Sequence, residues 1–567
     1  MVRLTRSARQ FARNALPALA LLGVFIRVDA QEAHATVVYT GTFITLDAGA
    51  PRVHAVAVRD GEIAATGSVA HVDSIAGSNV SHVALPGFVL PGFADAHAHP
   101  LFLGQQLESM DLHGLSKAEV LQRVAMAASK APAGAWIRGS GWDQAFWSPP
   151  NFPTASELDR ASNGHPVMLD RIDGHAIWVN DRALALARIE PGRADPSGGR
   201  IMRDATGAPT GIFLDSAMSL VTRAIPIATD ATIERQLRAA LAQYAAWGLT
   251  SVHDASADLQ VIRVWKSLAA RGALSTRMYV MAAAQDSTLT QALAAGTRVG
   301  GINDLLTLRS VKIVLDGALG SRGAQLASPY TDEPGKRGLS LVSDAELDSI
   351  IKLCIARGFQ VNVHAIGDEA NRRVLDAFAR AEPSTRALRF RDEHASLVPD
   401  DQLPRFAQLG VIASIQPVFV GEYSRFAEAR VGRARVHWVE RTRDFVTSGA
   451  RIASGTDYPA SDTGDPIATL FSMVTRRGAD GTPREGWLPD QRVSVDVALE
   501  SMTAGPAYAA FQETMLGAIT VGRAADFTVL SGDPYATQPS ELRSLRVLRT
   551  ILAGRIVYIN AKSRPSP

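Results

Sequence analysis

The chain has 567 residues, of which 46% are hydrophobic and 20% charged, and its formal charge at pH 7 is +2. This length can bury a large core, and it exceeds a single domain unless an α/β barrel takes up most of it. The near-neutral charge argues against a nucleic-acid partner, and the absence of a Gly-x-x-x-x-Gly-Lys-Ser/Thr loop argues against a P-loop nucleotide site.

Residues 1–30 have the pattern of an export signal. Arginines precede a short apolar run, ALPALALLGVFI, and Val28-Asp29-Ala30 then offers a cleavage site. The alternative is an uncleaved membrane anchor, but a spanning helix needs roughly 20 apolar residues. Removal of this segment lowers Lys+Arg from 58 to 53 and Asp+Glu from 56 to 55, which gives a formal charge of −2. We therefore expect an exported protein, periplasmic or secreted, without a stable membrane anchor.

The two ends of the remaining chain share a β-rich style. Residues 36–90 contain short apolar runs separated by turns, among them a hairpin signal at Arg59-Asp60-Gly61-Glu62. The C-terminal stretch repeats this style in GAITVGRAADFTVLSGDP and LRVLRTILAGRIVYIN. We expect residues 31–91 and 506–567 to form one composite β-sandwich domain.

The middle of the chain, residues 92–505, alternates strand-like and helical stretches, which favours βα units around a parallel sheet. Eight runs fit the strands of a (β/α)8 TIM-type barrel. A ninth, PVMLDR, is assigned to an insertion after the first strand, residues 103–240. The eight runs are 92–97, 249–254, 276–283, 311–316, 359–364, 388–394, 411–416 and 451–457.

Several of these runs end in a polar residue. Strands of a parallel barrel are buried on both faces, so polar residues there require a reason, and their carboxyl ends form the mouth where active sites lie. His97 and His99 are two residues apart on one strand, so they share a face and can bind one ion. Any one histidine is better explained as a hydrogen-bonded residue, but their convergence predicts a metal site. The candidates are His97, His99, Lys312, His364, His394 and Asp457.

Lys312 is unusual because it lies inside an aliphatic run, VKIVLDG. A buried lysine needs a partner. It could pair with Asp316, four residues on and on the same face, or it could have a lowered pKa and take part in chemistry. The single cysteine, Cys354, is expected to be a buried apolar residue of an amphipathic helix.

Several motifs together resemble the amidohydrolase superfamily, and within it the amidohydrolase 3 (YtcJ-like) branch of metal-dependent hydrolases. The resemblance covers nearly the whole chain after residue 30. It rests on LPGFADAHAHP, WIRGSGWDQAFW, DGHAIWVNDRAL, VKIVLDGALGSRGAQL, VNVHAIGDEAN, RDEHA, ASGTDYPA and GAITVGRAADFTVL, in this order.

The resemblance implies one or two divalent ions, with Zn²⁺ expected. His97, His99 and Asp457 would bind the more buried ion, and His364 and His394 the second. Lys312 would match the lysine that can be N6-carboxylated to bridge two ions. Asp457 would serve as general base and acid towards a metal-activated water.

We therefore expect hydrolysis of a non-peptide C–N bond in a small molecule, such as an N-acyl, N-formyl or cyclic amide. Ester, lactone or phosphoester hydrolysis on the same site is an alternative, and a non-catalytic binding protein is another. The oligomeric state stays open, and a homo-oligomer is compatible with the sequence. The predicted substrate contacts are Trp142, Asp143, His175 and Arg322.

Overall fold

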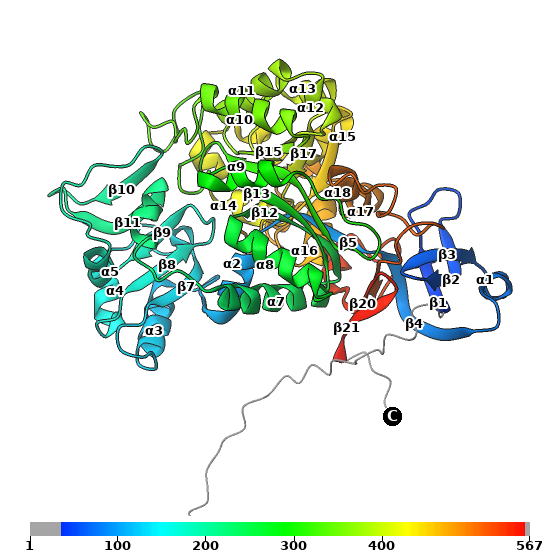
Figure 1. The fold of residues 1–567 in the computed structure, drawn as a ribbon. Helices are drawn as coiled ribbons and strands as arrows, with labels where there is room; N and C mark the ends of the chain where they lie inside the picture. Colours follow the sequence, from blue (N-terminus) through cyan, green and yellow to red (C-terminus); the bar gives the residue numbers. More distant parts are fainter. Residues whose placement is uncertain (1–35, 562–567) are drawn as a thin grey trace, which may run out of the picture.

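A parallel barrel forms the centre of the computed structural model, which describes residues 36–561. Eight strands are hydrogen-bonded in the order β18-β17-β16-β15-β14-β13-β12-β5, so the predicted barrel is confirmed (Figure 1). The segment after β18 meets β5, because the Asp457 N–H donates to the His97 carbonyl at 2.6 Å and the His99 N–H to the Tyr458 carbonyl at 3.0 Å. The barrel strands are β5 (Phe93–Ala98), β12 (Leu249–Ala257), β13 (Arg277–Ala283), β14 (Leu306–Val314), β15 (Gln360–Ala365), β16 (Arg391–His394), β17 (Ile412–Ile415) and β18 (Arg451–Ser454). The predicted export signal, residues 1–30, lies outside the described residues.

Amphipathic helices connect the barrel strands. In α10 a capping box of Ser343 and Glu346 starts the helix, and the apolar positions Leu347, Ile351 and Cys354 are buried. Cys354 is therefore a core residue, as predicted. The helices of this part are α7 (Asp230–Ala246), α8 (Leu259–Ala270), α9 (Asp286–Ala295), α10 (Asp344–Ala356), α11 (Asp368–Arg380), α12 (Ser384–Ala387), α13 (Leu403–Leu409), α14 (Phe419–Val431), α15 (Thr442–Thr447), α16 (Pro466–Thr475), α17 (Val495–Ser501) and α18 (Ala504–Ala509).

Strands from both ends of the described chain lie in one seven-stranded sheet of order β21-β20-β19-β4-β1-β2-β3. The composite domain that we expected as a β-sandwich is hydrogen-bonded as a continuous sheet, because the long β4 pairs with β1 and with β19. Phe43, Val89 and Phe527 belong to the core on this sheet, and α1 (Val69–Ala76) packs beside β1–β3. The strands are β1 (Thr36–Ile44), β2 (Arg52–Arg59), β3 (Glu62–Gly67), β4 (Val80–Pro91), β19 (Phe527–Leu530), β20 (Val547–Leu552) and β21 (Arg555–Ile559).

The chain between β5 and β12 builds a third sheet of six strands, which lies to the left of the barrel in Figure 1. The run PVMLDR is one of its strands, as the insertion assignment requires. Its strands span residues 110–215, a narrower range than 103–240, because α2 (Pro100–Glu108) and α7 pack against each other beside the barrel. The elements are β6 (Met110–Asp111), α3 (Lys117–Ala128), β7 (Ile137–Trp142), α4 (Ala155–Ser162), β8 (Val167–Arg171), β9 (Ala176–Val179), α5 (Asp181–Leu186), β10 (Gly199–Arg203), β11 (Pro209–Asp215) and α6 (Ser219–Thr222).

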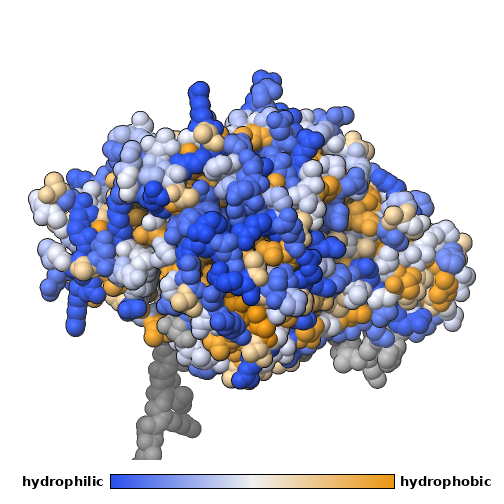
Figure 2. Space-filling view, turned by 90° about the horizontal axis from the view of Figure 1, so that it is seen from above, coloured by the Kyte–Doolittle hydropathy of each residue, from blue (hydrophilic) through white to orange (hydrophobic). Residues whose placement is uncertain are grey.

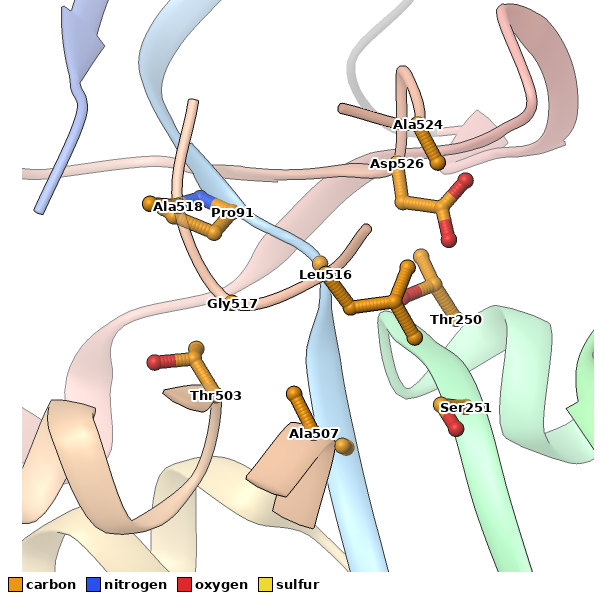
Figure 3. A pocket seen from close by; sticks show the side chains of 12 residues that line it. Pro91, Thr250, Ser251, Thr503, Ala507, Leu516, Gly517, Ala518, Ala524 and Asp526 are labelled. Atoms are coloured by element: carbon orange, nitrogen blue, oxygen red, sulfur yellow. The ribbon is translucent and has the colours of Figure 1, made fainter. Parts of the chain in front are cut away.

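The terminal sheet joins the barrel at the amino ends of β5 and β12. A Cβ on Gly92 would lie 2.0 Å from Thr250 Oγ1, so only glycine allows this close approach. A small pocket lies here, with Leu516 extending towards Thr250 (Figure 3). Asp526 on its wall forms a buried ion pair with Arg277 at 2.6 Å. Because catalytic groups of such barrels lie at the carboxyl ends of the strands, this pocket is part of the domain junction.

The surface seen from above is mostly hydrophilic, with hydrophobic patches between the charged side chains (Figure 2). Among residues 36–561, no helix combines the length and the apolar character that crossing a bilayer requires.

Candidate metal centre

Three predicted ligands meet where β5 and β18 end. His97 and His99 lie at the end of β5, and Asp457 follows β18. One donor atom from each of the three lies within 4.8 Å of the others. Asp457 Oδ1 is 3.0 Å from His99 Nε2 and 3.3 Å from His97 Nε2, yet this buried oxygen has no hydrogen-bond partner. Buried polar atoms are normally satisfied, so donors gathered in this way suit a cation between them.

Lys312 projects from β14 into the same centre. Its Nζ lies 3.1 Å from His97 Nε2, and the side chain is buried. Burial lowers the pKa of Lys312 to about 8. Of the two alternatives for this lysine, pairing with Asp316 is wrong: among the described residues the Asp316 carboxylate instead accepts backbone N–H groups from residues 325, 366 and 367.

His364 and His394 continue the cluster from β15 and β16. The ring centroid of His394 lies 4.7 Å from that of His97 and 4.4 Å from that of His364. His394 Nδ1 contacts Gln416 Oε1 at 2.8 Å, which leaves Nε2 as the atom available to a ligand. His364 Nε2 is buried without a well-formed hydrogen bond, and it lies 3.4 Å from Asp316 Oδ1. Burial lowers the pKa of both histidines well below the usual value, so both are neutral, the form that binds metals.

Two of these residues have unusual backbones. His394 has φ 79° and Asp457 has φ 61°, in the left-handed region that residues other than glycine rarely adopt. Simple alternation would place His394 on the face opposite to Glu393, whereas its ring lies against His97. The turn of the chain at the end of β16 therefore brings His394 to the barrel mouth, and such conformations are characteristic of functional sites.

A buried charge network next to His97 was not predicted from the sequence. Glu393 Oε2 lies 2.5 Å from His97 Nδ1, and Arg391 Nε lies 2.7 Å from Glu393 Oε1. Arg391 also donates to the Ala96 carbonyl and contacts His253. Burial opposes ionisation of Glu393, but the Arg391 charge holds its pKa well below the usual range. A carboxylate on Nδ1 fixes the ring orientation and directs Nε2 to a metal. Alternation in RDEH places Arg391 and Glu393 on the same face of the strand, and this pattern is the sequence signal from which their pairing could have been predicted.

The second barrel run supplies no ligand. His253 contacts the Arg391 guanidinium at 3.0 Å, and Asp254 accepts the Trp265 indole N–H at 2.8 Å. The two residues have different partners because side chains alternate along a strand: His253 faces the barrel interior and Asp254 faces helix α8.

A pocket adjoins the centre between the barrel mouth and the insertion. Its walls include Asp457 and His364, and also Asp143 and His175 of the predicted substrate contacts. His175 Nδ1 contacts Asp215 at 2.6 Å. Burial disfavours the His175 imidazolium, but the bond to Asp215 outweighs it and raises the pKa of His175 to about 9. The remaining nitrogen, Nε2, is the atom available to a substrate. Asp143 Oδ1 is held by Arg171 Nη2 at 2.5 Å.

The other two predicted substrate contacts lie elsewhere. Trp142 is fully buried in the insertion core, where its ring packs on Trp147 and Trp178 and its Nε1 donates to the Leu169 carbonyl. It is a core residue because β7 directs it away from the pocket wall. Arg322 pairs with Asp332 at 2.9 Å and is absent from the pocket lining.

Comparisons with known proteins agree with this geometry. A model described as the amidohydrolase family matches residues 87–558. The putative amidohydrolase YtcJ of Bacillus subtilis (strain 168) is 32% identical over 530 residues, 92% of this chain and 99% of the relative. An N-substituted formamide deformylase of Arthrobacter pascens is 28% identical, covering 91% of this chain and 96% of its own. The crystal structure of an uncharacterized metal-dependent hydrolase from Pyrococcus horikoshii OT3 superposes with a TM-score of 0.74 at 28% identity, covering 89% of this chain and 99% of that one. Over most of its length, this chain belongs to the amidohydrolase family.

Proposed function

We propose that the protein hydrolyses a non-peptide C–N bond in a small molecule, an N-formyl, N-acyl or cyclic amide. The observation that carries this proposal is the meeting of His97, His99 and Asp457 beside a pocket at the barrel mouth. The relative from Arthrobacter pascens is named for the deformylation of N-substituted formamides, which supports an amide as the substrate class.

The residues fit one or two divalent ions, and we propose Zn²⁺. His97, His99 and Asp457 would hold the first ion, and His364 and His394 the second. A bound divalent ion supplies Lewis-acid polarisation of a carbonyl and lowers the pKa of water towards about 7. Lys312 would bridge the two positions after its neutral Nζ adds to CO₂, which forms a carbamate and releases one proton. The lowered pKa of Lys312 favours this step, because only the neutral amine is a nucleophile.

Asp457 is the residue placed to move the proton. Burial opposes ionisation of Asp457, but contacts with His97 and His99 hold its pKa well below the usual range, so the side chain is an ionised carboxylate. It accepts a proton from the attacking water and delivers a proton to the leaving nitrogen as the C–N bond breaks. His175, held by Asp215, orients the substrate carbonyl from the pocket wall.

The test combines a substrate panel with one variant. Zinc-loaded protein is assayed on N-substituted formamides, N-acyl amides, cyclic amides, carboxylic esters and phosphotriesters, and Asp457→Asn is compared by turnover and bound zinc. We expect the amides to be cleaved and Asp457→Asn to lose about 10²–10⁴-fold in kcat while largely keeping its zinc. Unchanged turnover in the variant contradicts the role of Asp457. Preference for esters or phosphotriesters shifts the assignment to that class, and a protein that binds no metal is a non-catalytic relative.

We further propose that the protein acts outside the cytoplasm, on the basis of the export pattern in residues 1–30. Mass spectrometry of the intact protein from cell fractions tests this. We expect an exported form that lacks about the first 30 residues, whereas a full-length form confined to the cytoplasm contradicts the proposal.

A further inference from the structure

A large groove separates the insertion from the barrel and encloses about 2150 Å³ of space, including its opening to solvent. One wall consists of α2 and the segment between α6 and α7, and the other consists of α3, β7 and β8 of the insertion. Most of the side chains along it are apolar. Those used below are Phe102, Ala127 and Ile227.

The groove adjoins the pocket beside the metal centre. Arg171 and Ala460 line both hollows. Ala460 follows Asp457 in a tight turn, in which its N–H donates to the Asp457 carbonyl at 2.7 Å. A substrate with its amide at Asp457 would enter the groove by passing Ala460.

The charged residues of the groove are already paired within the protein. Arg138 lies 3.1 Å from Asp170, Glu108 accepts from Arg235 at 2.6 Å, and Arg171 is bound by Asp143. These pairs leave the groove without an evident electrostatic preference for an ionic ligand. Two large apolar side chains stay exposed at its edge, because Phe102 is 53% and Ile227 is 88% accessible. Exposed apolar groups around a groove are characteristic of binding surfaces for apolar ligands.

We propose that this groove binds an extended apolar substituent, such as an alkyl chain, of the amide cleaved at the metal centre. The inference rests on the proposed function and adds the substrate class: neutral amides with a long apolar group. That group can belong to the acyl side or to the amine side of the C–N bond. Each buried methylene is expected to raise kcat/KM about three- to fourfold until the groove is filled.

Two homologous series test the proposal, N-alkylformamides from methyl to decyl and N-methyl amides of acids from acetic to decanoic. The measured quantity is the ratio of kcat/KM for the longest and shortest members. We expect a ratio above about 100 in at least one series, and the series that shows it identifies the side of the bond. A flat profile in both series contradicts the groove assignment.

Two variants of α3 form a matched pair. Ala127 lines the groove, whereas Ala125 is exposed and is absent from its lining. We expect Ala127→Trp to lower the long-to-short ratio at least tenfold by filling the groove, and Ala125→Trp to keep the wild-type ratio. Equal ratios in the two variants overturn the proposal.

Binding without turnover separates failure of the groove from failure of the proposed function. Calorimetry with Asp457→Asn protein compares N-decylformamide with N-methylformamide, and repeats the decyl titration after an added Ala127→Trp change. Tighter decyl binding that Ala127→Trp weakens supports the groove, even if the wild type cleaves neither compound. Equal affinity for the two formamides contradicts it, even if both are cleaved.

Discussion

Replacing Glu393 with glutamine tests whether the buried charge network positions the metal ligands. The Glu393 carboxylate is fully buried, 2.5 Å from His97 Nδ1 and 2.7 Å from Arg391 Nε. Glu393→Gln removes the charge that balances Arg391, and an unpaired buried charge costs about 3–5 kcal/mol of stability. Loss of the partner that orients a metal-binding histidine lowers metal affinity about 10–100-fold, which corresponds to about 1.4–2.7 kcal/mol of binding free energy.

The assay is competition for Zn²⁺ against a chromophoric chelator, with thermal unfolding measured in parallel. The control is Asp392→Asn, at the residue that precedes Glu393 on β16 and is equally buried. Burial raises the pKa of Asp392 well above its usual value, which favours the neutral carboxyl that asparagine resembles. We expect weakened zinc binding in Glu393→Gln and a near-wild-type affinity in Asp392→Asn. Wild-type affinity in Glu393→Gln, or an equal loss in both variants, contradicts the role of Glu393 in positioning His97.

Three further predictions concern stability. Burial raises the pKa of Asp254 to about 7, so the folded state keeps a proton that the unfolded chain releases above about pH 4, and the free energy of unfolding falls as the pH rises towards 7. Asp254→Asn should therefore unfold at a higher temperature than the wild type at about pH 8 but not at about pH 4. Unfolding temperatures that change with pH in the same way in both proteins contradict this. Trp142→Ala should cost about 3–5 kcal/mol in urea unfolding, and a loss below about 1 kcal/mol shows that Trp142 is not a core residue. Gly92→Ala should lower the thermal midpoint because its Cβ meets the Thr250 side chain, and adding Thr250→Ala should restore part of it; no rescue indicates another cause.

Much of the barrel can be predicted from the sequence, because its signals are local. Each of the eight apolar runs overlaps one of β5 and β12–β18, and the spacing of His97 and His99 sets both on one side of β5. Asp457 is recognisable because it ends the last run, and chain order alone then brings β18 next to β5, where the first two ligands lie.

Other features depend on contacts between distant residues and cannot be inferred locally. Glu393 and Arg391 look like strand-end charges until their contacts with His97 and Ala96 are known, because those partners lie almost 300 positions earlier. From the sequence alone, Trp142 could be a surface or a core residue, and only its packing against Trp178 on β9 shows that it belongs to the core. In sequence, Lys312 could either pair with Asp316 or take part in chemistry with a lowered pKa, and the barrel places His97 rather than Asp316 beside it.

We propose that His97, His99 and Asp457 hold a catalytic cation at the barrel mouth. The most direct measurement is an anomalous difference map at the zinc edge from a crystal of the zinc-loaded protein. We predict a peak about 2.0–2.2 Å from a nitrogen of each histidine and from an Asp457 oxygen. A map with no peak at these three side chains, from protein that hydrolyses its amide substrate, would contradict the account.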